Sequence, residues 1–191
     1  MSDPLLIQID GNAVILTLSR PDVGNCLSAA LVEELHRGLD RFEESSAKVL
    51  IFQGKGRHFC TGFDLAGLAE QSDADLALRF IRIEQLLARI WNAPYPTIAI
   101  AADRTVGAGA DLFAACDRRI ATSTRLDAAT LARLRAALAV ERGSVDRQLA
   151  ELVRSVAEPG LKARMEDYRS RQRLRTPCHG RNVLGRGSRI A

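Results

Sequence analysis

Two short stretches decide the fold of this chain: HFCTGFDL at residues 58–65 and VGAGADL at residues 106–112. We call them the Phe63 turn and the Ala108 turn. Each follows a β-like run and leads into a helix-like run, so each places backbone N–H groups at the start of a helix. The first N–H groups of a helix lack partners within it, and the helix dipole is positive there. Two such turns facing one another could hold one developing oxyanion between them.

The composition and the cysteine spacing limit which classes of protein this chain can belong to. The 191 residues are 47% hydrophobic and 26% charged, which is typical of one globular domain, with room for an appendage. No apolar run reaches the roughly 18 residues of a membrane span, and the N-terminus lacks a secretory signal pattern. The four cysteines are widely spaced, with no Cys-x-x-Cys pair. We therefore expect a cytoplasmic protein with reduced thiols, no membrane contact and no metal site.

The positive net charge of +4 comes from the end of the chain. Residues 161–191 hold nine Lys and Arg side chains against two acidic ones, so the preceding residues carry eighteen basic and twenty-one acidic side chains. The body is mildly acidic, and the high pI does not indicate a nucleic-acid-binding body. We interpret the basic end as a solvated tail. Nucleic-acid binding through this tail is a third function, and it is less favoured than the two hypotheses given below.

Hydrophobic periodicity predicts an α/β order of elements. A hairpin of strands at 5–10 and 13–19, joined at Asp10-Gly11-Asn12, opens the chain. The further predicted strands are 49–53, 97–101 and 119–122. Ser28 is predicted to cap a helix to about Glu44, and Asp73 to cap a second, longer one. Shorter helices are predicted at 64–70 and 109–116. Because the helices alternate with strands, we expect parallel pairing after the hairpin.

Three regions follow from this pattern. Residues 1–122 form the predicted α/β core, and residues 123–172 form a helical region with predicted helices at 127–140, 145–156 and 161–172. Residues 173–191 are rich in Gly, Arg, Pro and Ser and lack periodicity, so we expect a basic, disordered tail. On the first long helix, His36 lies opposite the apolar stripe, and we expect its side chain to be solvated.

Taken in order, these segments resemble the crotonase family, also called the enoyl-CoA hydratase/isomerase family. The resemblance covers about residues 5–122 and rests on the ordered set rather than on any one piece. It implies an α/β, crotonase-like (ClpP/crotonase) ββα superhelix with a helical C-terminal region, assembled as trimers or hexamers. The segments that carry it are 14–21 (VILTLSRP), 25–27 (NCL), 49–54 (VLIFQG), 59–65 (FCTGFDL), 96–100 (PTIAI), 107–112 (GAGADL) and 116–121 (CDRRIA).

The resemblance also implies a site. Family members bind acyl-CoA thioesters and stabilise a thioester enolate with two backbone N–H groups, which by position are those of Phe63 and Ala108. No cofactor is implied beyond the coenzyme A of the substrate. Asp111 corresponds to the first of the two catalytic Glu residues of hydratases. The residues implied to border the substrate are Cys26, Leu27, Phe63, Asp64, Leu65, Ala66, Gly107 and Ala108.

The chain also departs from the family pattern. Asp111 is shorter than Glu by one C–C bond, about 1.5 Å, and it could instead simply complement the helix dipole. The second acid of the family follows the strand at 119–122, and no Pro-Glu stretch occurs there. An internal block is missing after residue 122 relative to the family. Two hypotheses therefore stay open: an enoyl-CoA hydratase/isomerase-type enzyme, or a catalytically weak CoA-thioester-binding or oligomer-partner protein.

Overall fold

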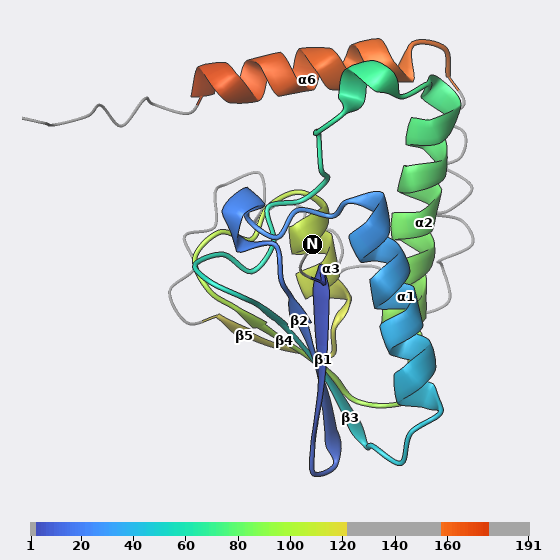
Figure 1. Cartoon of the computed structure of the whole chain (residues 1–191), viewed down its shortest axis with the longest axis vertical. Coiled ribbons are helices and arrows are strands. Elements are labelled where there is room, and N and C mark those ends of the chain that lie inside the picture. Colours follow the sequence, from blue (N-terminus) through green and yellow to red (C-terminus); the bar gives the residue numbers. More distant parts are fainter. Residues whose placement is uncertain (1–2, 122–157, 176–191) are drawn as a thin grey trace, which may run out of the picture.

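The computed structural model describes residues 3–121 and 158–175 of the chain (Figure 1). The helices predicted at 127–140 and 145–156, and the tail from residue 176 onward, lie outside these residues. The described part is a five-stranded sheet flanked by helices, with α1 (Ala29–Glu43) and α2 (Asp73–Trp91) side by side and α6 (Leu161–Arg175) crossing the start of α2. The described elements form the predicted α/β arrangement.

The sheet has the strand order β1-β2-β3-β4-β5. β1 and β2 pair antiparallel, and every later pair is parallel, as the predicted hairpin and crossovers require. Gly11 stands at the hairpin turn with a φ of +55°, a conformation that glycine adopts at no steric cost. The bounds are β1 Leu5–Asp10, β2 Ala13–Leu18, β3 Val49–Gly54, β4 Thr97–Ala101 and β5 Arg118–Ala121.

The helices lie between the strands as predicted, with shifts of a few residues at their ends. Among the described residues they are α1 Ala29–Glu43, α2 Asp73–Trp91, α3 Ala108–Ala115 and α6 Leu161–Arg175, with short 3₁₀ turns at Pro21–Val23 (η1) and Leu68–Glu70 (η2). The helix predicted at 64–70 is thus only the single turn η2. α6 continues three residues past its predicted end at 172, so residues 173–175 are helical.

The first long helix is fixed by a cap and an apolar face. The Ser28 hydroxyl accepts a hydrogen bond from the Leu31 N–H at 3.2 Å, as predicted. Leu35 and Leu39 are fully buried against the sheet. The prediction for His36 is wrong: its ring is buried, and Nε2 lies 3.1 Å from the Arg82 carbonyl oxygen. The side of α1 that carries His36 faces α2 rather than solvent, which the periodicity of one helix cannot show.

The predicted cap of α2 is also corrected. Ser72, not Asp73, is its N-cap, and Ser72 and Asp75 form a reciprocal capping box. The Asp73 carboxylate instead accepts the N–H groups of residues 160–162 at 2.8–3.2 Å, at the start of α6. A carboxylate there satisfies unpaired donors and complements the helix dipole. A side chain from the start of α2 therefore anchors α6.

Apolar contacts complete that attachment. Leu161 and Met165 of α6 are buried against Leu68 and Leu76, so α6 lies across the start of α2 (Figure 1). No helix within the described residues has the length and apolar character needed to cross a membrane. The placement of α6 matters for the site, because its exposed side forms one wall of the cavity described next.

Candidate active site

The Phe63 and Ala108 turns lie directly against one another. Cys60 of the Phe63 turn forms a β-bridge with Thr105, which directly precedes the Ala108 turn. The Val106 N–H donates to the Cys60 carbonyl oxygen at 3.2 Å. A Cβ atom on Gly62 would lie 2.9 Å from the Val106 carbonyl oxygen and 3.3 Å from the Ala108 nitrogen. Glycine is required here for two reasons: it has no Cβ atom to meet the Val106 carbonyl, and it readily adopts the φ of +94° found at this position. The juxtaposition expected from the sequence is therefore present.

The Phe63 N–H and the Ala108 N–H, one in each turn, have no acceptor among the described residues. The Gly62 carbonyl accepts the Leu27 N–H at 2.8 Å, and the Gly107 carbonyl accepts the Ala110 N–H at 2.8 Å. In a trans peptide the N–H points opposite to the carbonyl, so the Phe63 N–H points away from Leu27 and the Ala108 N–H points away from the body of α3. Neither N–H finds a hydrogen-bond acceptor within residues 3–121 and 158–175.

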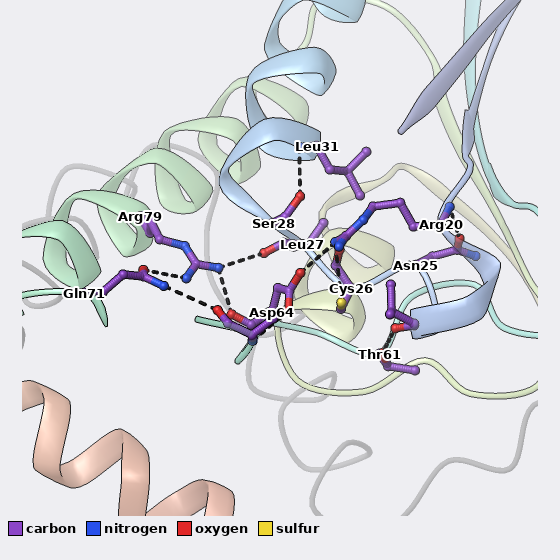
Figure 2. A network of polar contacts seen from close by, with 12 residues as sticks. Arg20, Asn25, Cys26, Leu27, Ser28, Leu31, Thr61, Asp64, Gln71 and Arg79 are labelled. Carbon is purple, nitrogen blue, oxygen red and sulfur yellow. Dashed lines mark hydrogen bonds and ion pairs between the residues drawn. The ribbon is translucent and has the colours of Figure 1, made fainter. Parts of the chain in front are cut away.

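A polar network fixes the Phe63 turn from two sides, as Figure 2 shows. On one side, Arg20 donates to the Asp64 carboxylate at 2.7 Å and to the Cys26 carbonyl at 2.8 Å. Burial alone would raise the pKa of the Asp64 carboxyl, but the Ala66 N–H and the Arg20 guanidinium outweigh it and hold that pKa below its usual value. Asp64 therefore stays ionised and acts as a tie within the loop.

On the other side, Arg79 of α2 reaches the same turn. Its guanidinium donates to the Asp64 carbonyl at 2.8 Å (Figure 2). The same group lies 4.0 Å from the centroid of the Phe63 ring. The Phe80 ring stacks on Phe63 with centroids 4.6 Å apart. A cation against a ring face and a stacked ring each add to apolar burial. The orientation of the Phe63 peptide is thus fixed by α2 as well as by the loop itself.

A cavity of about 750 Å³ opens beside the two turns. Its wall includes both turns, one side of α2 and the exposed side of α6. Three arginines and one tyrosine add polar groups to a largely apolar lining. The described residues that line it are Val23, Cys26, Thr61, Gly62, Phe63, Leu65, Phe80, Ile83, Glu84, Leu87, Arg104, Val106, Gly107, Ala108, Asp111, Arg164, Met165, Tyr168 and Arg169.

The cavity brings together most of the residues that the sequence predicted for the site. Those on its wall are Cys26, Phe63, Leu65, Gly107, Ala108 and Asp111. Three others lie behind the wall or beside it. Leu27 is fully buried, Asp64 is engaged with Arg20, and Ala66 follows in the loop with its N–H bonded to Asp64. Their side chains are positioned to support the Phe63 turn rather than to line the cavity.

Two carboxylates share the cavity wall, and the sequence predicted only one. Asp111 comes from the first turn of α3, and Glu84 comes from the middle of α2. The half-buried Glu84 carboxyl has a raised pKa, chiefly because it is desolvated and additionally because the Asp111 charge is near. Glu84 was detectable in principle, since it lies within the apolar stripe formed by Phe80, Ile83 and Leu87.

The cysteines are not set up as nucleophiles. Cys60 and Cys116 are buried, and burial raises the pKa of each thiol to about 12. Cys26 reaches the cavity, but desolvation and the Asp64 charge raise its pKa to about 11. A thiolate is the reactive form, so none of the three is activated. Within the described residues, no group of three His, Cys, Asp or Glu side chains could hold a metal ion.

Comparison with known proteins decides the family. The sequence pattern described as Enoyl-CoA hydratase/isomerase matches residues 8–134, well over half of the chain. The chain belongs to the enoyl-CoA hydratase/isomerase family. The match includes both turns and Asp111, so the predicted family resemblance is confirmed.

The relatives agree with this assignment. A probable enoyl-CoA hydratase from Rhodobacter capsulatus is 37% identical over 118 residues, which are 61% of this chain and 45% of that protein. Enoyl-CoA hydratase ACTT6 from Alternaria alternata is 36% identical over 120 residues, 62% of this chain and 39% of that protein. A solved structure assigned as an enoyl-CoA hydratase/isomerase, from Bordetella parapertussis, has a TM-score of 0.75 at 32% identity and covers 92% of this chain and 100% of that one. The chain spans less than half the length of these two curated relatives.

The close approach of the Phe63 turn and the Ala108 turn can be tested by substitution of Gly62. Substitution Gly62→Ala is expected to destabilise the fold by about 1–3 kcal/mol, because the new Cβ meets the Val106 carbonyl and the φ is positive. The matched control is Gly11→Ala, which also has a positive φ but no atom within 4 Å of the new Cβ. Urea denaturation should show the larger loss at Gly62; equal losses would mean that the two turns are not in contact.

Proposed function

We propose that this chain binds an acyl-CoA thioester in the cavity and stabilises its enolate between the Phe63 and Ala108 N–H groups. The reaction would be of the enoyl-CoA hydratase/isomerase type, with Asp111 as the general base. The observation that carries the proposal is the pair of N–H groups at the cavity wall, one in each turn, that have no acceptor among the described residues.

Backbone N–H donors at this position would stabilise the negative charge that develops during reactions of the hydratase/isomerase type. Adding water to an α,β-unsaturated thioester, or moving its double bond, places negative charge on the thioester oxygen. A preorganised N–H aimed at that oxygen contributes roughly 2.7–4 kcal/mol to transition-state stability. The Ala108 N–H carries in addition the positive end of the α3 dipole. The Arg20 and Arg79 contacts on the Phe63 turn supply the preorganisation on the other side.

The lining of the cavity suits the two halves of an acyl-CoA. Phe80, Ile83 and Leu87 of α2 present apolar surface that would face an acyl chain. Arg104, Arg164 and Arg169 bring positive charge to the same cavity, which would favour the phosphates of coenzyme A. Family membership further supports trimeric or hexameric assembly, which light scattering would test.

A second candidate is a weak or inactive CoA-thioester-binding protein. The observation that favours it is Asp111, whose carboxylate reaches about 1.5 Å less far than that of Glu. Under this alternative the chain binds the thioester and polarises it, but delivers water or a proton poorly. The two candidates differ in turnover and agree in binding.

Calorimetry and isotope exchange test the proposal together. We expect butyryl-CoA to bind the full chain, and we expect its Cα protons to exchange with D₂O, because enolate formation labilises them. Mass spectrometry of the recovered thioester reads out the exchange. Binding without exchange would select the second candidate. A folded chain that shows no heat of binding with butyryl-CoA or coenzyme A would contradict the acyl-CoA proposal altogether.

A further inference from the structure

We propose that Glu84 is the second catalytic carboxylate of this site and delivers a proton to the substrate in the cavity that it shares with Asp111. The inference rests on the proposed function and deepens it. The sequence contains no second acid at the usual family position after residue 122. The structure places a carboxylate on the same cavity wall from a different element, α2.

The position of Glu84 on α2 brings it to the cavity rather than to solvent. Ile83 and Leu87, its neighbours along the helix, and Phe80, one turn earlier, line the same cavity. Phe80 also stacks on Phe63, so the stretch of α2 that carries Glu84 is packed against the Phe63 turn. α2 and α3 are in contact as well, which brings the Glu84 carboxyl near that of Asp111.

The surroundings of Glu84 favour its protonated form. Desolvation raises the pKa of the Glu84 carboxyl, and the Asp111 charge raises it further. The raised pKa suits Glu84 to the role of the acid, which leaves the role of the base to Asp111. Among the described residues, the other titratable or charged groups on the same cavity are Cys26 and Arg104 from loops and Arg164, Tyr168 and Arg169 from α6.

The resulting hydration step balances. Asp111 accepts a proton from water as the water oxygen bonds to Cβ, and the π electrons of the C=C bond move to form the enolate, whose oxygen the Phe63 and Ala108 N–H groups hold. The enolate then reforms the carbonyl while Cα takes the proton of the Glu84 carboxyl. Glu84 ends as a carboxylate and Asp111 as an acid, and proton exchange with solvent restores both. The net change is addition of one water across the double bond.

Substitution Glu84→Gln tests this role, because it keeps the size of the side chain and removes the acidic proton. We expect kcat for hydration of crotonyl-CoA to fall about 10²-fold, with the calorimetric affinity for butyryl-CoA unchanged. The pH profile is the decisive readout. The wild-type rate should decline as pH rises through the raised pKa of Glu84, because only the protonated form donates, and the variant should lose this alkaline limb.

Matched variants separate the role from folding effects. Glu84→Asp should recover part of the rate and the alkaline limb, and Glu44→Gln, an exposed position at the end of α1, should leave both unchanged. A Glu84→Gln chain with wild-type kcat and pH profile would overturn the assignment of Glu84 and leave the proposed function standing. A wild-type chain that binds crotonyl-CoA without hydrating it would overturn the proposed enzyme itself, and Glu84 with it.

Discussion

Asp111→Asn is expected to lower kcat for crotonyl-CoA hydration by about 10²–10⁴-fold, the range that general acid–base catalysis supplies. The amide cannot accept the proton of the attacking water. The affinity for butyryl-CoA should be kept, because the two N–H donors and the apolar wall of α2 remain. Steady-state kinetics on the full chain, with calorimetry beside it, separates these two effects.

Asp10→Asn is the matched control for that variant. Asp10 is exposed at the end of β1, far along the chain from either turn, and the same change of a carboxylate to an amide there should leave kcat unaltered. Rapid hydration of crotonyl-CoA that is indifferent to Asp111→Asn would mean that Asp111 only complements the dipole of α3. Equal rate losses at Asp10 and Asp111 would point to a general effect of charge.

The two carboxylates also couple in a way that single variants cannot show. If Asp111 takes a proton and Glu84 gives one in the same turnover, each single variant already impairs the joint proton transfer. The double variant should then lose much less than the product of the two single losses. Independent contributions would instead multiply. A double-mutant cycle on kcat therefore tests whether the two side chains act as one unit.

The parts of the fold that could be predicted from the sequence are those encoded locally. The hairpin follows from Asp10-Gly11-Asn12, α1 from the Ser28 cap, and the two turns from their glycines after buried strands. Periodicity within one segment suffices for such features, because each is fixed by neighbours in sequence. Within the two turns, the resemblance to the family assigned Phe63, Ala108 and Asp111, and the structure puts all three on one cavity wall.

What the sequence could not show depends on contacts between helices. His36 is polar and off the apolar stripe of α1, yet it is buried because α2 packs over that side. Asp73 was predicted to cap its own helix, but it binds the start of α6, about ninety residues later in the chain. Glu84 lies on the cavity because α2 packs beside α3. Each case needs tertiary packing that no single segment encodes.

The oxyanion proposal has its own variant, Phe63→Pro, which removes the N–H donor. We expect kcat for hydration, and the rate of Cα exchange in butyryl-CoA, to fall by about 10²–10³-fold, the usual loss for one such donor. Phe63→Ala is the control, since it loses the ring contacts with Arg79 and Phe80 but keeps the N–H.

The comparison of these two variants isolates the backbone group. Packing loss is common to both, so it should lower stability and affinity in each, whereas the additional loss of rate should appear only with proline. Urea denaturation confirms that both chains fold. If Phe63→Ala and Phe63→Pro lose activity equally, the ring and not the N–H of Phe63 serves the reaction, and the enolate must be held elsewhere. If only Phe63→Pro abolishes exchange, the single backbone N–H of Phe63 is needed to stabilise the negative charge on the thioester oxygen.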